Sequence, residues 1–159
     1  MDKTAFYINA LSAADILRDV DPGTSSRSSG CNAQMSSINL ASGSCDYVTR
    51  CGGSRNVWEQ RVQLYDWNYI IPEDEREFLE SDWNKLKVDY PELLKSDLKL
   101  HCQCPSFIYS FHYLSDAMDY ALEPQPNPPG SINPNNPRNP DLIGTVCKHL
   151  VSVLRTYFL

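Results

Sequence analysis

Two short stretches decide the fold: HCQCP at residues 101–105 and GTVCKHL at residues 144–150. Each stretch holds two metal-ligating side chains separated by a single residue, so both side chains of a pair can reach one ion from an extended chain or a tight turn. Three thiolates and one imidazole are a donor set typical of a structural zinc ion, closed and tetrahedral at roughly 2.0–2.3 Å. The sequence therefore predicts one structural Zn²⁺ held by Cys102, Cys104, Cys147 and His149.

The residues around these pairs predict which elements carry them. Leu98 and Leu100 alternate with polar residues up to Cys102, which is typical of a short strand. Apolar residues recur at helical intervals over residues 146–157, so the second pair lies at the start of a final helix. His101 adjoins the first pair but should face the opposite side of its strand, and we expect it not to be a ligand.

The second half of the chain is typical of a small α+β domain. Residues 58–67 alternate apolar and polar side chains as a half-buried strand does, and residues 78–90 carry apolar residues at helical intervals. An amphipathic helix is predicted over residues 107–121. Residues 123–140 contain seven of the eleven prolines and should form an irregular crossing segment. We expect a small antiparallel sheet and two or three helices around the zinc, in a domain spanning residues 56–159.

The first third of the chain predicts a helix followed by an irregular arm. Residues 1–20 place apolar side chains at helical intervals, whereas residues 22–54 are dominated by Ser, Gly, Thr and Asn. Such a segment buries too little apolar surface to offset the cost of its own ordering, so we expect a partner protein to order it. We assign residues 1–55 to this N-terminal helix and arm. Three cysteines of the arm match no common zinc spacing and are expected to be free thiols, with a second metal as the less favoured alternative: Cys31, Cys45 and Cys51.

Composition and charge narrow the function classes. The chain has 159 residues, a formal net charge of −6 and a pI near 4.9, and its Lys and Arg never form a run. A nucleic-acid surface would therefore need a local basic patch. No stretch approaches the ~18 consecutive apolar residues of a membrane span, and the acidic N-terminus does not resemble a signal peptide. We expect a reducing compartment, where clustered Cys and His are metal ligands rather than disulfides.

Catalysis finds no support in the sequence. The GxSxG, HExxH, P-loop and GxGxxG motifs are absent, and no HxE precedes the cysteines as it does in zinc deaminases. A zinc ion with four protein ligands also leaves no position for a substrate, so we expect the protein not to be an enzyme. The aromatic residues of 107–120 form either a core face or a stacking platform for single-stranded nucleic acid. Core packing is favoured because Phe107 and Phe111 lie on the apolar stripe.

The Cys-x-Cys and Cys-x-His pairs resemble those of the SWIM-type zinc finger, in which the first pair follows a strand and the second begins a helix. The resemblance covers residues 98–154, about a third of the chain, and implies the same four ligands and a nucleic-acid-binding or regulatory role. The spacer between the pairs, residues 105–146, holds 42 residues and is longer than is usual for that family. This longer form, from about residue 58 to the C-terminus, is similar to small uncharacterised proteins of large tailed bacteriophages, which implies a virion component assembled in the host cytoplasm.

Two functions follow as expectations. The favoured one is a structural, zinc-stapled component of a phage virion, in its capsid, neck, tail or baseplate, which contacts other virion proteins through residues 22–54. The alternative is a SWIM-type nucleic-acid-binding or regulatory module. The scattered Lys and Arg disfavour the alternative, because it requires a contiguous basic face.

Overall fold

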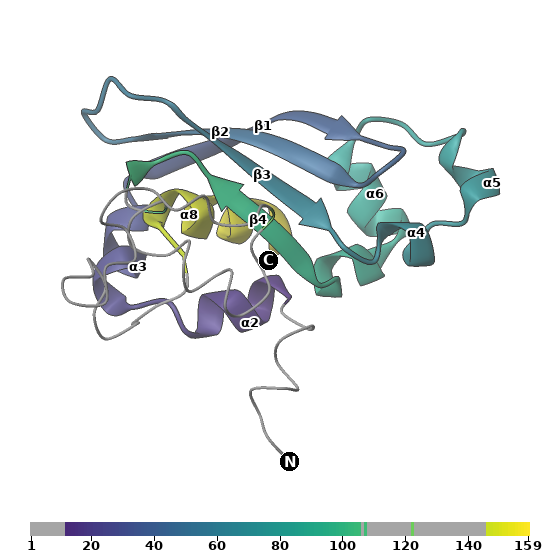
Figure 1. Cartoon of the computed structure of the whole chain (residues 1–159), viewed down its shortest axis with the longest axis horizontal. Coiled ribbons are helices and arrows are strands. Elements are labelled where there is room, and N and C mark those ends of the chain that lie inside the picture. The colour runs from purple at the N-terminus through teal and green to yellow at the C-terminus, as the bar shows by residue number, and fades with distance from the viewer. Residues whose placement is uncertain (1–11, 106, 108–121, 123–145) are drawn as a thin grey trace, which may run out of the picture.

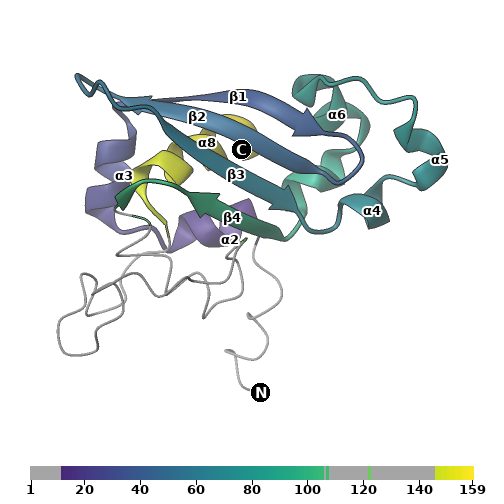
Figure 2. The same ribbon diagram turned by 45° about the horizontal axis from the view of Figure 1, so that its top comes forward.

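A four-stranded antiparallel sheet organises the protein (Figure 1). The computed structural model describes residues 12–105, 107, 122 and 146–159. Within these residues the strands lie side by side in chain order, as Figure 2 shows: β1 (Cys31–Asn39), β2 (Ser44–Cys51), β3 (Trp58–Leu64) and β4 (Leu98–Cys102). The predicted small α+β domain with an antiparallel sheet is confirmed.

Helices cover one face of the sheet and one of its ends. The C-terminal helix α8 (Lys148–Phe158) packs across all four strands, and α2 (Ala13–Arg18) and α3 (Pro22–Ser28) pack against α8 on the same side (Figure 1). The connection from β3 to β4 forms the far end of the molecule. It contains α4 (Trp67–Ile70), α5 (Glu73–Arg76), α6 (Trp83–Asp89) and the 3₁₀ helix η1 (Pro91–Lys95).

The core lies between the sheet and α8. Alternate residues of the strands point inward, because side chains along a strand alternate between its two faces. In β4 the inward residues are Leu98, Leu100 and Cys102, all buried. The helix α8 contributes five buried apolar side chains to this core: Leu150, Val151, Val153, Leu154 and Phe158.

The segment 22–54, expected as an irregular arm, is instead a helix and a β-hairpin, so that expectation is wrong. Asp21 caps α3 by accepting a hydrogen bond from the amide of Thr24 at 3.0 Å. The strands β1 and β2 pair with each other, and β2 also pairs with β3 in regular register. Residue 55 therefore lies in a connection within one continuous sheet. The strands of the segment 22–54 pair with each other and with β3 of the same chain.

The prediction of free thiols is also wrong for two of the three cysteines in this segment. Cys31 and Cys51 are directly opposite each other in the β1–β2 register and form a disulfide. Cys45 is a free, buried thiol of the core. The pairing depends on the strand register, which the spacing of the cysteines does not reveal.

The tip of the β1–β2 hairpin requires a glycine. Gly43 has a φ of +75°, and a Cβ atom there would lie 2.4 Å from Cγ of Trp67. The indole Nε1 of Trp67 donates a hydrogen bond to the carbonyl of Leu40 at 3.0 Å. The hairpin is thus fixed against α4 by close packing and one hydrogen bond.

The predicted helices are confirmed where the structure describes them. The final helix is α8, and α2 lies within the range of the predicted N-terminal helix, whose residues 1–11 are outside the described residues. The helix expected over residues 78–90 begins later, at Trp83, where Asp82 caps its first turn. The helix predicted over 107–121, with His112, and the proline-rich segment 123–140 lie outside the described residues. In the described part of the chain, none of the helices has the length and apolar character to cross a membrane.

Candidate metal centre

The end of β4 and the start of α8 bring four ligand side chains together. Cys102 is the last residue of β4, Cys104 follows the strand, and Cys147 and His149 lie at the N-terminus of α8. All four are buried, and their candidate ligand atoms lie within 4.8 Å of one another. Ligands of a tetrahedral zinc ion are roughly 3.3–3.8 Å apart, given bonds of 2.0–2.3 Å. Small side-chain movements therefore suffice for these four donors to hold one metal ion.

The N-terminus of α8 positions the second ligand pair. Cys147 is the N-cap residue, with φ −74° and ψ 167°, and its carbonyl accepts the first helical hydrogen bond from Val151 at 3.0 Å. Its side chain makes no capping hydrogen bond, so the sulfur stays directed to the cluster. His149 follows within the first turn, and its Nδ1 lies 3.9 Å from Sγ of Cys102. The positive end of the helix dipole favours negative charge on the Cys147 sulfur.

Three N–H groups point at the sulfurs of the first pair. The amide of Cys104 donates to Sγ of Cys102 at 3.5 Å, and the amide of Phe107 donates to Sγ of Cys104 at 3.2 Å. The side-chain amide of Gln60 on β3 also donates to Sγ of Cys102, at 3.4 Å. Donors around a sulfur stabilise its thiolate form, which is the form that binds metal ions.

Gln60 is itself held in place by two further contacts. Its Nε2 donates to the carbonyl of Trp58 at 2.8 Å, and its Oε1 accepts a hydrogen bond from the hydroxyl of Thr49 at 2.5 Å. Gln60 and Thr49 are both buried. Sequence analysis missed this support, although a glutamine at an inward position of a strand is a signal that it needs a buried partner.

The electrostatics of the cluster favour a bound cation. Hydrogen bonds from the thiols of Cys102 and Cys147 lower the pKa of Cys104 far below its usual range. Burial raises the pKa of Cys102 to about 12 and raises that of Cys147 well above its usual value. Without a metal ion the three side chains therefore carry one negative charge, on Cys104, whereas a coordinated divalent ion deprotonates its thiol ligands.

One tryptophan, Trp58, and one further histidine, His101, lie beside the candidate metal centre. The ring of Trp58 lies 6.5 Å from that of His149, between centroids, so its fluorescence can report on the site. His101 lies one residue before Cys102, on the opposite face of β4 from the buried residues, and packs edge-on against Phe107 at 5.5 Å. It is not among the four clustered side chains.

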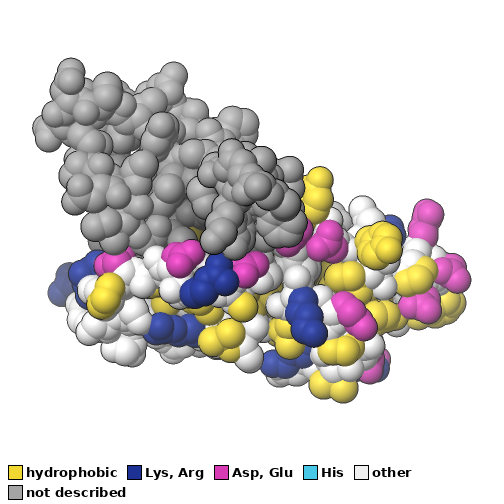
Figure 3. Space-filling view, turned by 90° about the horizontal axis from the view of Figure 1, so that it is seen from below, with side chains coloured by type: hydrophobic (Ala, Val, Ile, Leu, Met, Phe, Trp, Pro, Cys, Tyr) yellow, Lys and Arg dark blue, Asp and Glu magenta, His cyan; other side chains and the backbone are white. Residues whose placement is uncertain are grey.

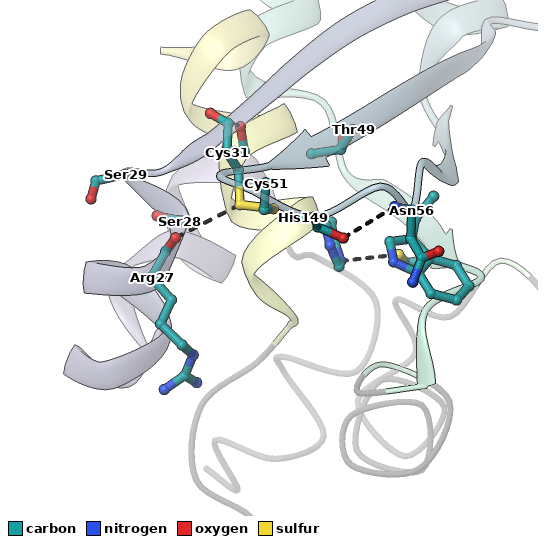
Figure 4. Close-up of a disulfide and its surroundings, with 12 residues drawn as sticks. Arg27, Ser28, Ser29, Cys31, Thr49, Cys51, Asn56 and His149 are labelled. Carbon is teal, nitrogen blue, oxygen red and sulfur yellow. Dashed lines mark hydrogen bonds between the residues drawn. A yellow bond between two sulfur atoms is a disulfide. The ribbon is translucent and has the colours of Figure 1, made fainter.

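The disulfide and the remaining cysteine lie outside the metal cluster. Cys31 and Cys51 join the beginning of β1 to the end of β2, beside α3 (Figure 4). The carbonyl of Cys31 accepts a hydrogen bond from the hydroxyl of Ser152 on α8 at 3.4 Å. Cys45 is buried, which raises its pKa to about 12, and it is not part of the cluster. The six cysteines therefore fall into three groups: two form a disulfide, one is a free thiol of the core, and three belong to the cluster.

No family of known proteins, no curated protein and no solved structure matches this chain. What the structure shows is that Cys102, Cys104, Cys147 and His149 come together in one buried cluster. A buried cluster able to bind one metal ion is thus the functional feature that the chain itself provides.

Proposed function

We propose that the protein is a structural module stapled by one zinc ion at Cys102, Cys104, Cys147 and His149. The observation that carries this proposal is the convergence of four buried donors from two ligand pairs that are separated by 42 residues along the chain. An ion bound there ties the end of β4 to the beginning of α8. The helix that covers the whole inner face of the sheet is thereby fixed at its first residue.

The donor set favours zinc among the common metals. Thiolate and imidazole ligands suit Zn²⁺, whereas Mg²⁺ and Ca²⁺ prefer oxygen ligands, and the cluster contains none. Four protein donors complete a tetrahedral shell, so a bound ion has no open position for water or substrate. This closed arrangement supports a structural role rather than a catalytic one.

Metal analysis of the native chain tests this part of the proposal. Protein purified without added metal or chelator is expected to contain one zinc per chain by mass spectrometry of the elements. One iron per chain, with the visible absorption of an iron–thiolate centre, would show that the structural metal is iron rather than zinc. Native protein that contains no metal and gains no thermal stability when Zn²⁺ is added would overturn the proposal.

A place in a virion, where the module would contact other protein chains, is proposed on the sequence resemblance to phage proteins alone. The segment 22–54 no longer provides an argument for such contacts, because its strands pair within the chain's own sheet. Purified particles of the phage that encodes the chain are expected to contain it in stoichiometric amount. Its recovery solely among soluble proteins of the lysate would contradict the virion assignment and leave the metal site unaffected.

The alternative of a nucleic-acid-binding module is less well supported. On the face shown in Figure 3, Lys and Arg side chains are separated by acidic and apolar ones. Arg61 is paired with Asp46 at 2.7 Å, and Arg155 donates hydrogen bonds to Ser25 and Ser28 on α3. Affinity for single- or double-stranded DNA that falls steeply with salt would favour this alternative.

A further inference from the structure

The chain carries its net negative charge at one end of the molecule. Residues 66–92, which include α4, α5 and α6, contain nine acidic and three basic residues. Their excess of six negative charges equals the formal net charge of −6 of the whole chain. The remainder of the sequence is balanced, so the electrostatic field of the protein originates from this end.

Apolar side chains are exposed at the same end. Phe78 is 79% exposed and Val88 is 75% exposed. Between α5 and α6 lies a hollow of about 220 Å³, which we call the acidic groove. Its apolar lining is Phe78, Leu79, Leu86 and Tyr90, and its charged lining is Glu75, Glu80, Lys85 and Asp89. Figure 3 shows yellow and magenta side chains intermixed at this end.

Two of the three basic residues of this end are already engaged. The guanidinium of Arg76 donates to the carbonyls of Ile71 and Asn68, at 3.0 and 3.1 Å. Lys85 pairs with Glu80 at 3.2 Å. Glu77 and Asp89, in contrast, form no ion pair with any residue that the structure describes. The groove thus presents negative charge that local cations leave uncompensated.

We propose that the acidic groove docks a segment of a partner protein in which Lys or Arg residues flank a large apolar side chain. The apolar side chain would enter the hollow against Phe78 and Leu86, while the cationic groups face the surrounding carboxylates. The aliphatic stems of Lys or Arg can also cover Val88. This surface is separate from the metal centre, so the proposal does not depend on bound metal.

Charge selects this occupant over the others. A nucleic acid or an anionic membrane would be repelled by the acidic end. A second copy of the chain would bring the same acidic surface to a two-fold symmetric contact, which like charge disfavours. A basic segment with an apolar anchor satisfies both the charge and the exposed Phe78.

Peptide binding tests the proposal directly. The probe is a short fluorescein-labelled peptide in which Lys residues flank a central Leu-Phe pair. Its binding to the full chain is measured by fluorescence anisotropy. One matched peptide replaces Lys by Gln, and another replaces Leu-Phe by Ser. Saturable binding of the first peptide is expected, with a loss of affinity of at least about tenfold for each matched peptide and further weakening by salt.

Variants of the full chain locate the binding. Phe78→Ala and Asp89→Asn are each expected to lower the affinity for the first peptide by about tenfold or more. Neither should change the melting temperature of the protein, because both side chains are exposed. Leu159→Ala is the matched control, since Leu159 is 69% exposed and lies outside the groove. Its binding should equal that of the wild type.

Four results would overturn the proposal. The first is the absence of binding, and the second is equal binding of the Lys/Leu-Phe and Lys/Ser peptides, which indicates diffuse attraction alone. The third is binding that Phe78→Ala leaves unchanged. The fourth is self-association of the chain in sedimentation that Phe78→Ala abolishes, which would assign the groove to a second copy.

Discussion

Replacing Cys104 by serine is the sharpest perturbation of the candidate metal centre. The substitution Cys104→Ser exchanges the sulfur for a hydroxyl that binds zinc poorly at neutral pH. Serine is close to cysteine in side-chain volume, so the packing around the site changes little. The thiols of Cys102 and Cys147 stay buried beside it and are protonated without the ion, because burial raises the pKa of both.

The expected loss of stability follows from how α8 is held. Zinc supplies about 10–16 kcal/mol in isolated finger peptides, which have no core without the metal. Here α8 also buries five apolar side chains, each worth about 1.5–3 kcal/mol, so the helix remains docked without the ion. The loss is then about 3–4 kcal/mol, the stabilisation supplied by a ligand present at roughly 100 to 1,000 times its dissociation constant. For a chain of this length that lowers the melting temperature by about 6–16 °C.

Five measurements check this expectation. Elemental analysis should show no tightly held metal in Cys104→Ser, and cobalt substitution should produce thiolate-to-cobalt absorption in the wild type alone. Calorimetry gives the melting temperature. The fluorescence of Trp58 should change on metal removal because its ring lies 6.5 Å from that of His149, whereas far-UV dichroism should stay close to that of the wild type.

Cys45→Ser is the matched control, because Cys45 is buried but lies outside the cluster. It should lose stability through its buried hydroxyl and still bind one metal ion. The reasoning fails if Cys104→Ser retains one tightly bound ion and melts with the wild type. Complete unfolding of Cys104→Ser would show instead that packing of α8 is weaker than the buried side chains indicate.

Three further changes have defined outcomes. Gln60→Leu removes the side-chain donor to the Cys102 sulfur and should weaken metal binding about 10- to 100-fold in chelator competition, with the metal still bound at saturation. Reduction of the Cys31–Cys51 disulfide should lower the free energy of unfolding by about 3 kcal/mol without release of metal, and the double Ser variant should match the reduced wild type in melts. Burial, with the nearby carboxylates, raises the pKa of Asp97. Its protonated form is therefore favoured by folding, and its contribution to stability is lost as pH rises through the folded pKa. Asp97→Asn should stabilise the protein at pH 7 by less than about 1 kcal/mol and leave it unchanged at pH 3, in urea titrations at both pH values.

The sequence predicts the elements whose patterns are local. The strand β4 alternates apolar and polar residues, and α8 carries an apolar pattern of helical period, so both were expected close to their observed positions. The ligand set was found because each pair lies within one short segment. These signals need no knowledge of the tertiary structure.

The hairpin of β1 and β2 was missed because its stability comes from distant residues. The hydroxyl of Tyr157 on α8 accepts a hydrogen bond from the amide of Met35 at 2.8 Å and lies 3.4 Å from the carbonyl of Ala33 as a donor. These bonds cover the free edge of β1, which is rich in Ser and Asn. Composition alone does not reveal that a tyrosine more than a hundred residues later satisfies this edge.

The long spacer between the two ligand pairs does not count against a shared metal ion. The cost of closing a flexible loop grows only with the logarithm of its length, by about 0.6 kcal/mol for each doubling. The spacer also returns to the sheet before its end, because the amide of Leu122 donates to the carbonyl of Leu100 on β4 at 2.9 Å. That contact divides the 42 residues into two shorter loops. The ligand assignment therefore depends on where the two ligand pairs lie, at the end of β4 and at the start of α8. The packing of β4 and α8 in the core fixes both positions, whatever the length of the spacer.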